Sequence, residues 1–394
     1  MKRVLVIGYG ISGKGTMALL KSLGISSVAV DKNPEAGVLT DSADFSLDGI
    51  SQVVLSPGVM PSHPLVQRAQ QMGIEVIGEI ELAMRHTHNR CVGITGSNGK
   101  TTTTLLTAHA LHFAGIKAKA VGNVGTALST YLLKADPEEI LVVELSSFQL
   151  ETLQQKKLEI AAYLNLTPNH LDRYPSMQQY AQAKAKIQRC LIEGNPLLVS
   201  SQVWRDYGST LEQGNVEIYD GQDSLAAIFA EEYIQLPRQN VCAAERICLH
   251  FGVSKETFVE SLKSFQKPPH RVEWVAEVNG VRYYNDSKAT SVAAVVHAVS
   301  LFKHPLILIV GGVDKGAPYQ PWIEALRGKV KQFVAYGQAA LKMQQELSPH
   351  YPFARAGTLA EATAMARQLA KRGDIVILTP GCSSYDQSQN YEHR

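Results

Sequence analysis

The sequence has few of the features that mark disulfide-rich, membrane-spanning or secreted proteins. Its five cysteines are odd in number and no two form a C-x-x-C pair, which argues against a disulfide framework and against a structural zinc site. Apolar runs such as Pro305 to Val310 are far shorter than the roughly 20 residues of a membrane helix. The apolar run from Val4 to Ile7 is shorter than the roughly 7–15 residues of a secretory signal core. We therefore expect a soluble, cytoplasmic protein without a membrane partner.

An excess of charge of either sign is also absent. Lysine and arginine number 38 and aspartate and glutamate 36, so the formal net charge is +2. A protein that binds nucleic acid through a bulk positive field carries more positive charge than this, so we expect no nucleic-acid partner. The chain has 394 residues, of which 45% are apolar. That length is enough for two or three domains of roughly 150 residues, each able to bury its own core.

Short apolar, β-branched runs alternate with helical patterns along most of the chain. Runs of this kind suit strands that are covered on both faces. The expected strands are Val4–Ile7, Ser27–Val30, Gln52–Leu55, Cys91–Ile94, Ile140–Leu145, Ile160–Leu164 and Leu306–Val310. Helical stretches include Thr101–Phe113 and Leu359–Ala370. The alternation predicts an α/β fold with mainly parallel sheets.

Two boundaries divide the chain into three expected domains. The polar stretch from His86 to Arg90 precedes a new strand, and Lys267-Pro268-Pro269-His270 interrupts the chain again because consecutive prolines end a helix. The expected domains are 1–86, 87–267 and 268–394, each of ordinary domain size.

A glycine-rich loop, Gly8-Tyr9-Gly10-Ile11-Ser12-Gly13, follows the first expected strand and opens an expected helix from Lys14 to Leu23. Glycines in this context let a pyrophosphate approach the backbone, and the helix N-terminus offers it unpaired N–H groups. We expect a diphosphate-bearing nucleotide here, contacted by Gly10, Ile11, Ser12, Asp31 and Gly58. A glycine turn kept only for strand–helix packing is the alternative, and a plain tight turn is as good an interpretation of Ser56-Pro57-Gly58. The motif does not separate NAD, FAD and UDP.

A second glycine-rich loop, from Gly93 to Thr102, follows the strand that starts at Cys91. It ends in Gly99-Lys100-Thr101, as a phosphate-binding P-loop does, although Ile94 stands where the ordinary P-loop has its first glycine. Backbone amides of such a loop cradle phosphates, the lysine adds positive charge and the threonine hydroxyl binds Mg²⁺. The residues expected to bind nucleotide phosphates are Gly96, Ser97, Asn98, Gly99, Lys100, Thr101 and Thr102.

Two further polar residues follow expected strands after the P-loop. Glu144 ends the strand Ile140–Leu145, where P-loop proteins hold Mg²⁺ with a second carboxylate. His170 follows the strand Ile160–Leu164 and is either a metal ligand or a substrate contact, since α/β sheets place their chemistry at strand C-termini. A solvated loop histidine is the alternative. A dehydrogenase needs only the first glycine-rich loop, and a simple ATPase needs only the second. The presence of both in one chain argues against either class.

These loops, with further strings in the same order, resemble the Mur ligase family of peptidoglycan synthesis. The resemblance covers the whole chain. Its strings are Gly8–Gly13, Ser56-Pro57-Gly58, Thr95–Thr101, Gly122-Asn123-Val124-Gly125, Glu144–Leu150, His170-Leu171-Asp172-Arg173-Tyr174, Pro269-His270-Arg271, Asn285–Thr290 and Gly311-Gly312. Two of them, E-L-S-S-F-Q-L from Glu144 and N-D-S-K-A-T from Asn285, are typical of the members that add D-glutamate.

The resemblance implies three domains and a reaction. A Rossmann-like N-terminal domain is expected to bind the UDP part of the substrate. A P-loop-type central domain is expected to be the ATPase, and a Rossmann-like C-terminal domain to bind the incoming amino acid. The implied activity is ATP-dependent addition of D-glutamate to UDP-N-acetylmuramoyl-L-alanine through an acyl phosphate, in cytoplasmic peptidoglycan precursor synthesis. We expect the enzyme to act as a monomer.

The resemblance also assigns roles to residues. The expected catalytic residues are Lys100, His170, Lys184 and Lys288. Two Mg²⁺ ions are expected, with ligands from Thr101, Glu144, His170 and a carbamylated Lys184. The carbamate matters because an amine cannot bind a cation, whereas a carbamate is a carboxylate on a long arm; Lys186 is a weaker candidate for it. The other implied ATP contacts are Asn240, Arg271 and, at the ribose, Asp286. The implied D-glutamate contacts are Lys288, Thr290, Lys315, Ser384 and Tyr391. The implied contacts to the muramoyl-alanine end are Asn123, Ser146 and Gln149.

Rival interpretations fall into three classes: another ligase of the same superfamily, an oxidoreductase and a non-catalytic switch. Folylpolyglutamate synthetase lacks an N-terminal domain like residues 1–86, and the diaminopimelate-adding Mur ligase carries a D-N-P-R string that this chain does not have. An NAD(P)-dependent oxidoreductase would use the first loop but leaves Gly99-Lys100-Thr101 unexplained. A non-catalytic ATP-binding switch would not need both substrates for phosphate release.

Overall fold

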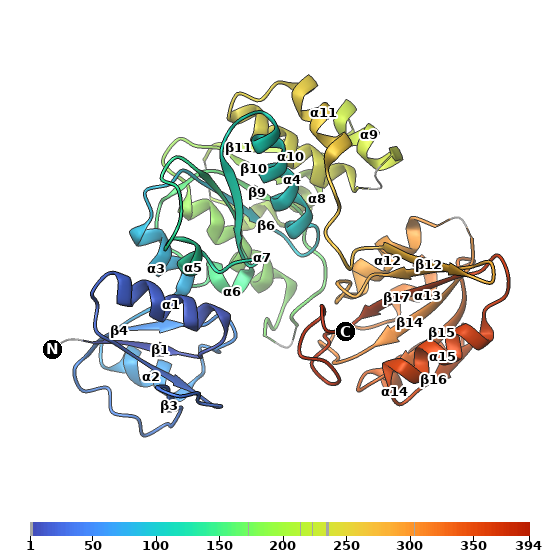
Figure 1. Cartoon of the computed structure of the whole chain (residues 1–394), viewed down its shortest axis with the longest axis horizontal. Coiled ribbons are helices and arrows are strands. Elements are labelled where there is room, and N and C mark those ends of the chain that lie inside the picture. The colour runs from blue at the N-terminus through green and yellow to red at the C-terminus, as the bar shows by residue number, and fades with distance from the viewer. Residues whose placement is uncertain (1–2, 172, 213, 223, 234–235, 303) are drawn as a thin grey trace. The chain divides into compact units, whose positions relative to one another are not determined.

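The computed structural model in Figure 1 describes residues 3–171, 173–212, 214–222, 224–233, 236–302 and 304–394. It is a mixed α/β fold with three mainly parallel sheets. The chain divides into two compact units. One unit contains Met1–Leu166 and Tyr180–Phe265, and the other contains Thr167–Gln179 and Gln266–Arg394. The expected α/β class is confirmed, and the expected domain boundaries stay predictions.

The first sheet has five parallel strands in the order β3-β2-β1-β4-β5. They are β1 (Arg3–Ile7), β2 (Ser27–Asp31), β3 (Leu39–Thr40), β4 (Ile50–Leu55) and β5 (Glu75–Gly78). The helices of this part are α1 (Ile11–Ser22), α2 (Pro64–Gln71) and α3 (Glu79–His86). Apolar side chains such as Leu5, Val53 and Leu65 are fully buried between sheet and helices, as the continuous apolar runs predict for strands covered on both faces.

The second sheet lies in the same unit and has six parallel strands in the order β11-β10-β9-β6-β8-β7. They are β6 (Cys91–Thr95), β7 (Ala118–Gly122), β8 (Ile140–Glu144), β9 (Leu158–Tyr163), β10 (Leu197–Ser200) and β11 (Val216–Tyr219). The helical elements are α4 (Lys100–Phe113), α5 (Leu128–Tyr131), α6 (Ser147–Leu150), α7 (Met177–Ala185), η1 (Lys186–Cys190), α8 (Ser201–Tyr207), η2 (Gly208–Thr210), α9 (Leu225–Tyr233), α10 (Arg238–His250) and α11 (Lys255–Ser264). Helices α4 and α10 share one apolar core with strands β6 and β8.

The third sheet belongs to the other unit and has the order β12-β13-β17-β14-β15-β16. Its strands are β12 (Glu273–Val278), β13 (Val281–Asn285), β14 (Leu306–Gly311), β15 (Val330–Tyr336), β16 (Phe353–Arg355) and β17 (Ile375–Gly381). Only the β12–β13 pair is antiparallel among the described pairs. The helices are α12 (Val292–Ser300), α13 (Pro321–Ala325), α14 (Ala340–Leu347) and α15 (Leu359–Leu369).

The expected strands and helices all form, with ends that shift by a few residues. The clearest difference is at the first glycine loop, where α1 begins at Ile11 rather than at Lys14. The second half of that loop is therefore the first helical turn, because nothing in Ile11-Ser12-Gly13 prevents helical backbone angles. All five cysteines are free and buried.

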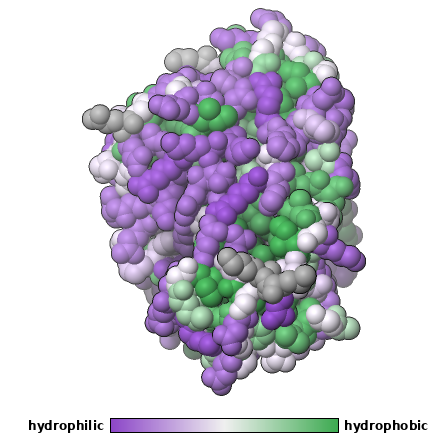
Figure 2. Space-filling model, turned by 90° about the vertical axis from the view of Figure 1, so that its left-hand side faces the viewer, coloured by the Kyte–Doolittle hydropathy of each residue, from purple (hydrophilic) through white to green (hydrophobic). Residues whose placement is uncertain are grey.

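One face of the molecule is mostly hydrophilic, with smaller apolar patches (Figure 2). No helix among the described residues is long and apolar enough to cross a membrane.

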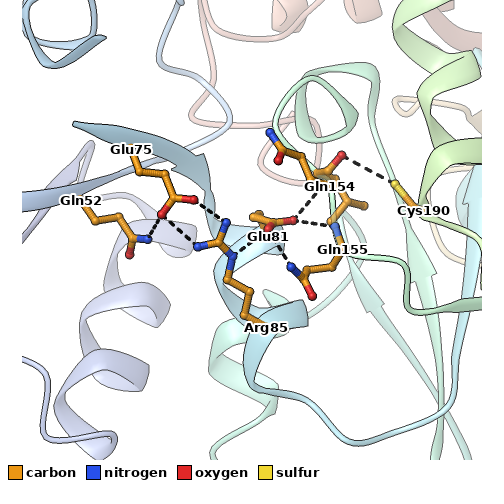
Figure 3. A network of polar contacts seen from close by, with 8 residues as sticks. Gln52, Glu75, Glu81, Arg85, Gln154, Gln155 and Cys190 are labelled. Carbon is orange, nitrogen blue, oxygen red and sulfur yellow. Dashed lines mark hydrogen bonds and ion pairs between the residues drawn. The ribbon is translucent and has the colours of Figure 1, made fainter. Parts of the chain in front are cut away.

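Two buried carboxylates of α3 join the first sheet to the second. Glu81 is fully buried and accepts hydrogen bonds from the backbone N–H groups of Gln154 and Gln155, at 2.8 and 3.0 Å. Arg85 donates to Glu81 at 2.7 Å and also forms an ion pair with Glu75 (Figure 3). Each oxygen of the Glu81 carboxylate therefore accepts at least one hydrogen bond, as a buried charged group requires.

The second carboxylate, Glu79, lies two residues earlier and is also buried. It accepts a hydrogen bond of 2.7 Å from the backbone N–H of Ser129, at the start of α5. Burial raises the pKa of Glu79, and the hydrogen bond from Ser129 offsets part of that effect. Helices α1, α3 and α5 meet here so closely that a Cβ on Gly15 would lie 2.3 Å from the Thr130 hydroxyl. The glycine-rich loops of the two sheets thus lie in one compact unit.

We predict that Glu81→Ala lowers the free energy of unfolding of the first unit by about 3–5 kcal/mol, because it leaves the backbone N–H groups of Gln154 and Gln155 without their acceptor and removes one of the two carboxylates that Arg85 contacts. Urea unfolding followed by circular dichroism measures this. Glu138→Ala is the control, since Glu138 is 77% exposed and forms a surface ion pair with Lys117, and we expect little change. Equal effects of the two substitutions would contradict the role given to Glu81.

Candidate active site

The loop between β6 and α4 has the shape of an anion cradle. Gly96 and Gly99 have φ angles of 155° and 79°, which side-chain-bearing residues rarely adopt. Asn165, which follows β9, holds the loop: its Oδ1 accepts from the Asn98 N–H at 2.9 Å and its Nδ2 donates to the Asn98 carbonyl at 3.0 Å. Lys100 and Thr101 then begin α4, so the N-terminus of this helix borders the loop.

Asn240 lies directly against this loop. It is buried on α10, and a Cβ on Gly99 would come within 2.1 Å of its side-chain nitrogen. A glycine at 99 is therefore required by the contact as well as by the φ angle. Thr101 is half-buried and Thr102 is buried in the first turn of α4. The structure brings the expected P-loop residues and the expected ATP contact Asn240 together.

Two lysine amines converge on the carbonyl oxygen of Gly96. Lys100 Nζ donates to it at 2.8 Å and Lys184 Nζ at 2.9 Å. Lys184 is 1% exposed, and its amine lies 4.8 Å from the ring centre of Tyr180, one helical turn earlier on α7. Burial lowers the pKa of Lys184 well below its usual value, the charge of Lys100 lowers it further, and the nearby Glu144 opposes both. The Lys184 amine is thus biased toward its neutral, nucleophilic form.

Glu144 supplies a buried carboxylate at the end of β8. Its Oε1 accepts a hydrogen bond of 2.9 Å from the side chain of Asn123. Its Oε2 is buried and receives no hydrogen bond from any described residue. An ionised oxygen in this state is costly to bury unless a cation binds it, so the donor set fits a hard metal ion. By themselves, the described residues contain no group of three or more His, Cys, Asp or Glu side chains arranged as a metal site.

Ser146 and Gln149 mainly satisfy each other. They form a capping box at the start of α6, in which the Ser146 hydroxyl accepts from the Gln149 N–H and the Gln149 side chain accepts from the Ser146 N–H. This local role is complete without a ligand. Their expected contact to substrate stays a prediction, as does that of Asn123.

The glycines in and beside the first glycine-rich loop have different roles. Gly8 has a φ of 89°, and a Cβ on Gly13 would lie 2.0 Å from the Gly8 carbonyl oxygen. These two glycines serve strand–helix packing. In contrast, a Cβ on Gly10 or on Gly58 would meet nothing within 4 Å. Packing thus explains one pair of glycines, while the space beside the other pair is open to a ligand.

Asp31 organises this loop from the end of β2. Its carboxylate accepts from the backbone N–H of Tyr9 at 2.6 Å and of Asn33 at 2.8 Å. These hydrogen bonds lower the pKa of Asp31, so the group stays ionised. Ile11, 78% exposed, and the half-buried Ser12 lie in the adjoining helical turn.

In the second unit, Asp286 is held at the end of β13. Its oxygens accept from the Thr379 hydroxyl at 2.9 Å and from the Val272 N–H at 3.2 Å. Burial raises the pKa of Asp286 to about 7, against the lowering effects of these bonds and of the nearby Arg271. His270 and Val272, on either side of Arg271, have positive φ angles of 62° and 48°. The sharp backbone path here positions Arg271 beside the Asp286 carboxylate.

The expected amino-acid contacts follow three adjacent strands. Lys288 and Thr290 follow β13, Lys315 follows β14 and Ser384 follows β17; these strands are parallel neighbours, so their carboxyl ends share one sheet edge. Lys288 Nζ lies 3.7 Å from the ring centre of Tyr391. Ser384 is buried and lines a cavity of about 380 Å³.

His170 has a positive φ of 56°, and its carbonyl oxygen accepts from the N–H of Tyr174 at 2.9 Å. It falls in the segment Thr167–Gln179, which groups with the second unit. Asp172 of the same string lies outside the described residues. A metal-ligand role for His170 stays a prediction.

Three residues at these sites were not expected from the sequence. Asn165 shapes the P-loop, Tyr180 covers Lys184, and Ser56 donates to the Gly8 carbonyl at 2.8 Å. The only available signal was that Asn165 and Ser56 follow expected strands directly. Tyr180 had the helical i, i+4 spacing to Lys184, but many helical pairs share that spacing.

Comparisons with known proteins agree with the geometry. The family model for the Mur ligase middle domain matches residues 94–213, and the model for the Mur ligase, glutamate ligase domain matches residues 270–382. The chain is 40% identical over 425 residues to the UDP-N-acetylmuramoylalanine–D-glutamate ligase of Protochlamydia amoebophila strain UWE25, covering 100% of this chain and 96% of that protein. It is 35% identical over 438 residues, with the same coverage, to the enzyme of that name from Thermoanaerobacter sp. strain X514.

Solved structures share the fold at low sequence identity. The UDP-N-acetylmuramate–alanine ligase MurC of Thermotoga maritima superposes with a TM-score of 0.60 at 14% identity, over 97% of this chain and 96% of that one. MurF of Acinetobacter baumannii gives a TM-score of 0.61 at 15% identity, over 96% and 88%.

We predict that Gly13→Ala lowers the stability of the protein by about 1–3 kcal/mol, since its Cβ would overlap the Gly8 carbonyl. Gly10→Ala is the matched control: its φ is −73° and its Cβ has no neighbour within 4 Å, so the change should stay within about 0.5 kcal/mol. Thermal unfolding measures both. A large loss in Gly10→Ala would mean that packing, not ligand access, explains this glycine.

Proposed function

The chain belongs to the Mur ligase family, and we propose that it joins D-glutamate to UDP-N-acetylmuramoyl-L-alanine, with ATP converted to ADP and phosphate, in peptidoglycan precursor synthesis. The observation that carries the proposal is full-length similarity, at 35–40% identity, to ligases named for this reaction. The pairing of a P-loop with a second glycine loop supports it. Monomeric state and cytoplasmic location stay predictions.

Each of the three sheets would carry the binding site for one substrate. Residues 1–86, a Rossmann-like domain, would bind the UDP part beside Gly10, Ile11, Ser12, Asp31 and Gly58. Residues 87–267, a P-loop-type domain, would bind ATP, and residues 268–394, a second Rossmann-like domain, would bind D-glutamate. The first assignment is supported by the open space beside Gly10 and Gly58.

The phosphate loop and its neighbours fit ATP. The loop and first helical turn, Gly96–Thr102, would surround the phosphates, and Lys100 would neutralise them. Because Lys100 and Lys184 both donate to the Gly96 carbonyl, an anion in the cradle would provide a better partner for the Lys100 charge. Asn240 supports the loop from α10. Arg271 and Asp286, in the second unit, are the other proposed ATP contacts.

Mg²⁺ fits the donor set around Glu144, whose Oε2 is buried without a donor. Glu144 and the Thr101 hydroxyl would hold one ion, and His170 with a carbamylated Lys184 a second. The ions would supply charge neutralisation where a carboxylate and a triphosphate meet. The lowered pKa of Lys184 supports the carbamate: its neutral amine attacks CO₂, an N–C bond forms and one proton is released to water.

The reaction activates a poor acyl donor. The substrate carboxylate attacks the γ-phosphorus of ATP, and ADP leaves; the product is an acyl phosphate, whose leaving group is phosphate instead of oxide. The D-glutamate amine then attacks the acyl carbon, the C–O bond breaks, and an amide, phosphate and a proton result. Asn123, Ser146 and Gln149 are proposed to orient the muramoyl-alanine end. Exclusion of water matters because water would hydrolyse the acyl phosphate.

D-Glutamate carries two carboxylates, so its site needs donors in two places. Lys288, Thr290, Lys315, Ser384 and Tyr391 are the proposed contacts. Lysine ammonium groups and hydroxyls suit carboxylates through charge-assisted hydrogen bonds.

We expect ADP formation only when ATP, UDP-N-acetylmuramoyl-L-alanine and D-glutamate are all present. A coupled assay with amino acids offered singly tests this, and L-glutamate should support no comparable turnover. ADP release without the amino acid would favour an ATP-binding switch. A change in nicotinamide absorbance on adding NAD(P)H with the sugar nucleotide would favour an oxidoreductase.

We further expect Lys184→Ala to lower kcat by at least roughly a hundredfold, because a carboxylate-like metal ligand is lost. Lys186→Ala is the control, since Lys186 is half-buried and donates to the Glu151 carbonyl at 3.3 Å. With ¹³C-bicarbonate, a carbamate NMR signal should be present in the wild type and in Lys186→Ala and absent in Lys184→Ala. Full activity of Lys184→Ala at every bicarbonate and Mg²⁺ concentration would refute the assignment.

A further inference from the structure

The loop after β14 is clamped to helix α14 at several points. Lys342 Nζ donates to Asp314 Oδ2 at 2.7 Å and to the Ala317 carbonyl at 3.1 Å. Glu346 accepts from the backbone N–H of Tyr319 at 2.7 Å. Lys342 and Glu346 are four residues apart and so lie on one face of α14. The loop 312–320, which carries Lys315, is therefore held to a regular element and does not move independently of it.

Tyr319 connects this loop to the segment after β17. Its hydroxyl lies 2.9 Å from Asp314 Oδ1 and 3.1 Å from Cys382 Sγ, and both side chains, Tyr319 and Cys382, are almost fully buried. A hydroxyl has one proton, which goes to the carboxylate, so the Cys382 thiol donates to the hydroxyl oxygen. Burial raises the pKa of Cys382 to about 12, and the thiol keeps that proton.

The same two segments are also bridged by backbone. Val313 and Ser383 exchange hydrogen bonds, N–H to carbonyl, at 2.9 and 3.1 Å. Lys315 lies two residues after Val313, and Ser384 directly follows Ser383. Backbone pairing fixes the segments at a single point, whereas the Cys382–Tyr319–Asp314 chain adds a second connection that fixes their relative rotation.

We propose that Asp314 and Tyr319 are positioning residues of the amino-acid site, which set the separation between Lys315 and Ser384 and so match the two carboxylates of D-glutamate. This inference rests on the proposed function. Its physical basis is preorganisation: donors held at the ligand's spacing bind without the entropy cost of ordering the loop at each encounter. Neither residue needs to touch the substrate.

A merely structural role would lower stability or affect all substrates alike. A positioning role is selective, since Lys315 and Ser384 contact only the amino acid in the proposed site. A positioning role therefore predicts a higher KM for D-glutamate alone, whereas a structural role predicts changes in all three KM values.

The test compares Tyr319→Phe with Tyr351→Phe in the full-length enzyme. Tyr351 is the matched control because its hydroxyl also donates within this unit, to the Ile323 carbonyl at 2.9 Å, but contacts neither segment. In Tyr319→Phe we expect KM for D-glutamate to rise roughly tenfold, as loss of one charge-assisted hydrogen bond allows. The KM values for ATP and for the sugar nucleotide should stay within about twofold, and Tyr351→Phe should leave all three unchanged.

A second pair of variants covers the case in which Tyr319→Phe does not fold. Lys342→Met removes the partner of Asp314 from a side chain that is 35% exposed, and it should raise KM for D-glutamate in the same selective way. Lys342→Arg keeps the charge and should restore most of the affinity. An unchanged D-glutamate KM in the folded variants, or an equal rise in all three KM values, overturns the inference. If the wild type forms no ADP with D-glutamate, the proposed function fails instead.

Discussion

The convergence of two lysine amines on the Gly96 carbonyl oxygen is the constraint on which the central site depends. Two ammonium groups donating to one acceptor repel each other, and the conflict is strongest for Lys184, which has almost no access to water. Burial lowers the pKa of Lys184, and the charge of Lys100 lowers it further. The arrangement biases the Lys184 amine toward its neutral form beside Lys100, the residue proposed to bind phosphate. Glu144, at the end of β8, opposes this lowering of the Lys184 pKa.

Rigid support for this site comes from several elements of the same unit. Asn165 and Asn240 hold the phosphate loop from β9 and α10, and the buried carboxylates Glu79 and Glu81 attach the first sheet to the second. Removing the donors of a buried carboxylate is costly, so the hydrogen bonds of Glu79 and Glu81 favour the packing arrangement that supplies them. The two glycine-rich loops, proposed to bind the sugar nucleotide and ATP, therefore lie in one compact unit.

In the second unit, a chain of hydrogen bonds between charged and neutral side chains holds the loops in place. The parallel strands β13, β17 and β14 end at one edge, and the loops beyond them carry the proposed amino-acid contacts. Loops alone would place these contacts loosely. The connections from Lys342 through Asp314 and Tyr319 to Cys382 convert two loops into one rigid surface.

The sequence by itself determined the α/β class, the position of the strands, the phosphate loop and the carboxylate at the end of β8. These features depend on local patterns, such as apolar runs, glycines at fixed spacing and a polar residue where a strand ends. Such patterns involve residues that are close in the sequence, so they can be recognised without the structure. Glycine spacing did not distinguish Gly13, which packing requires, from Gly10, which it does not, because the difference is the position of a carbonyl oxygen in space. Tyr180 with Ser97, Asn98 with Asn165, and Tyr319 with Cys382 are separated by 83, 67 and 63 residues. No periodicity links residues so far apart, so only the tertiary structure, through burial and hydrogen-bond geometry, decided which of them support the sites.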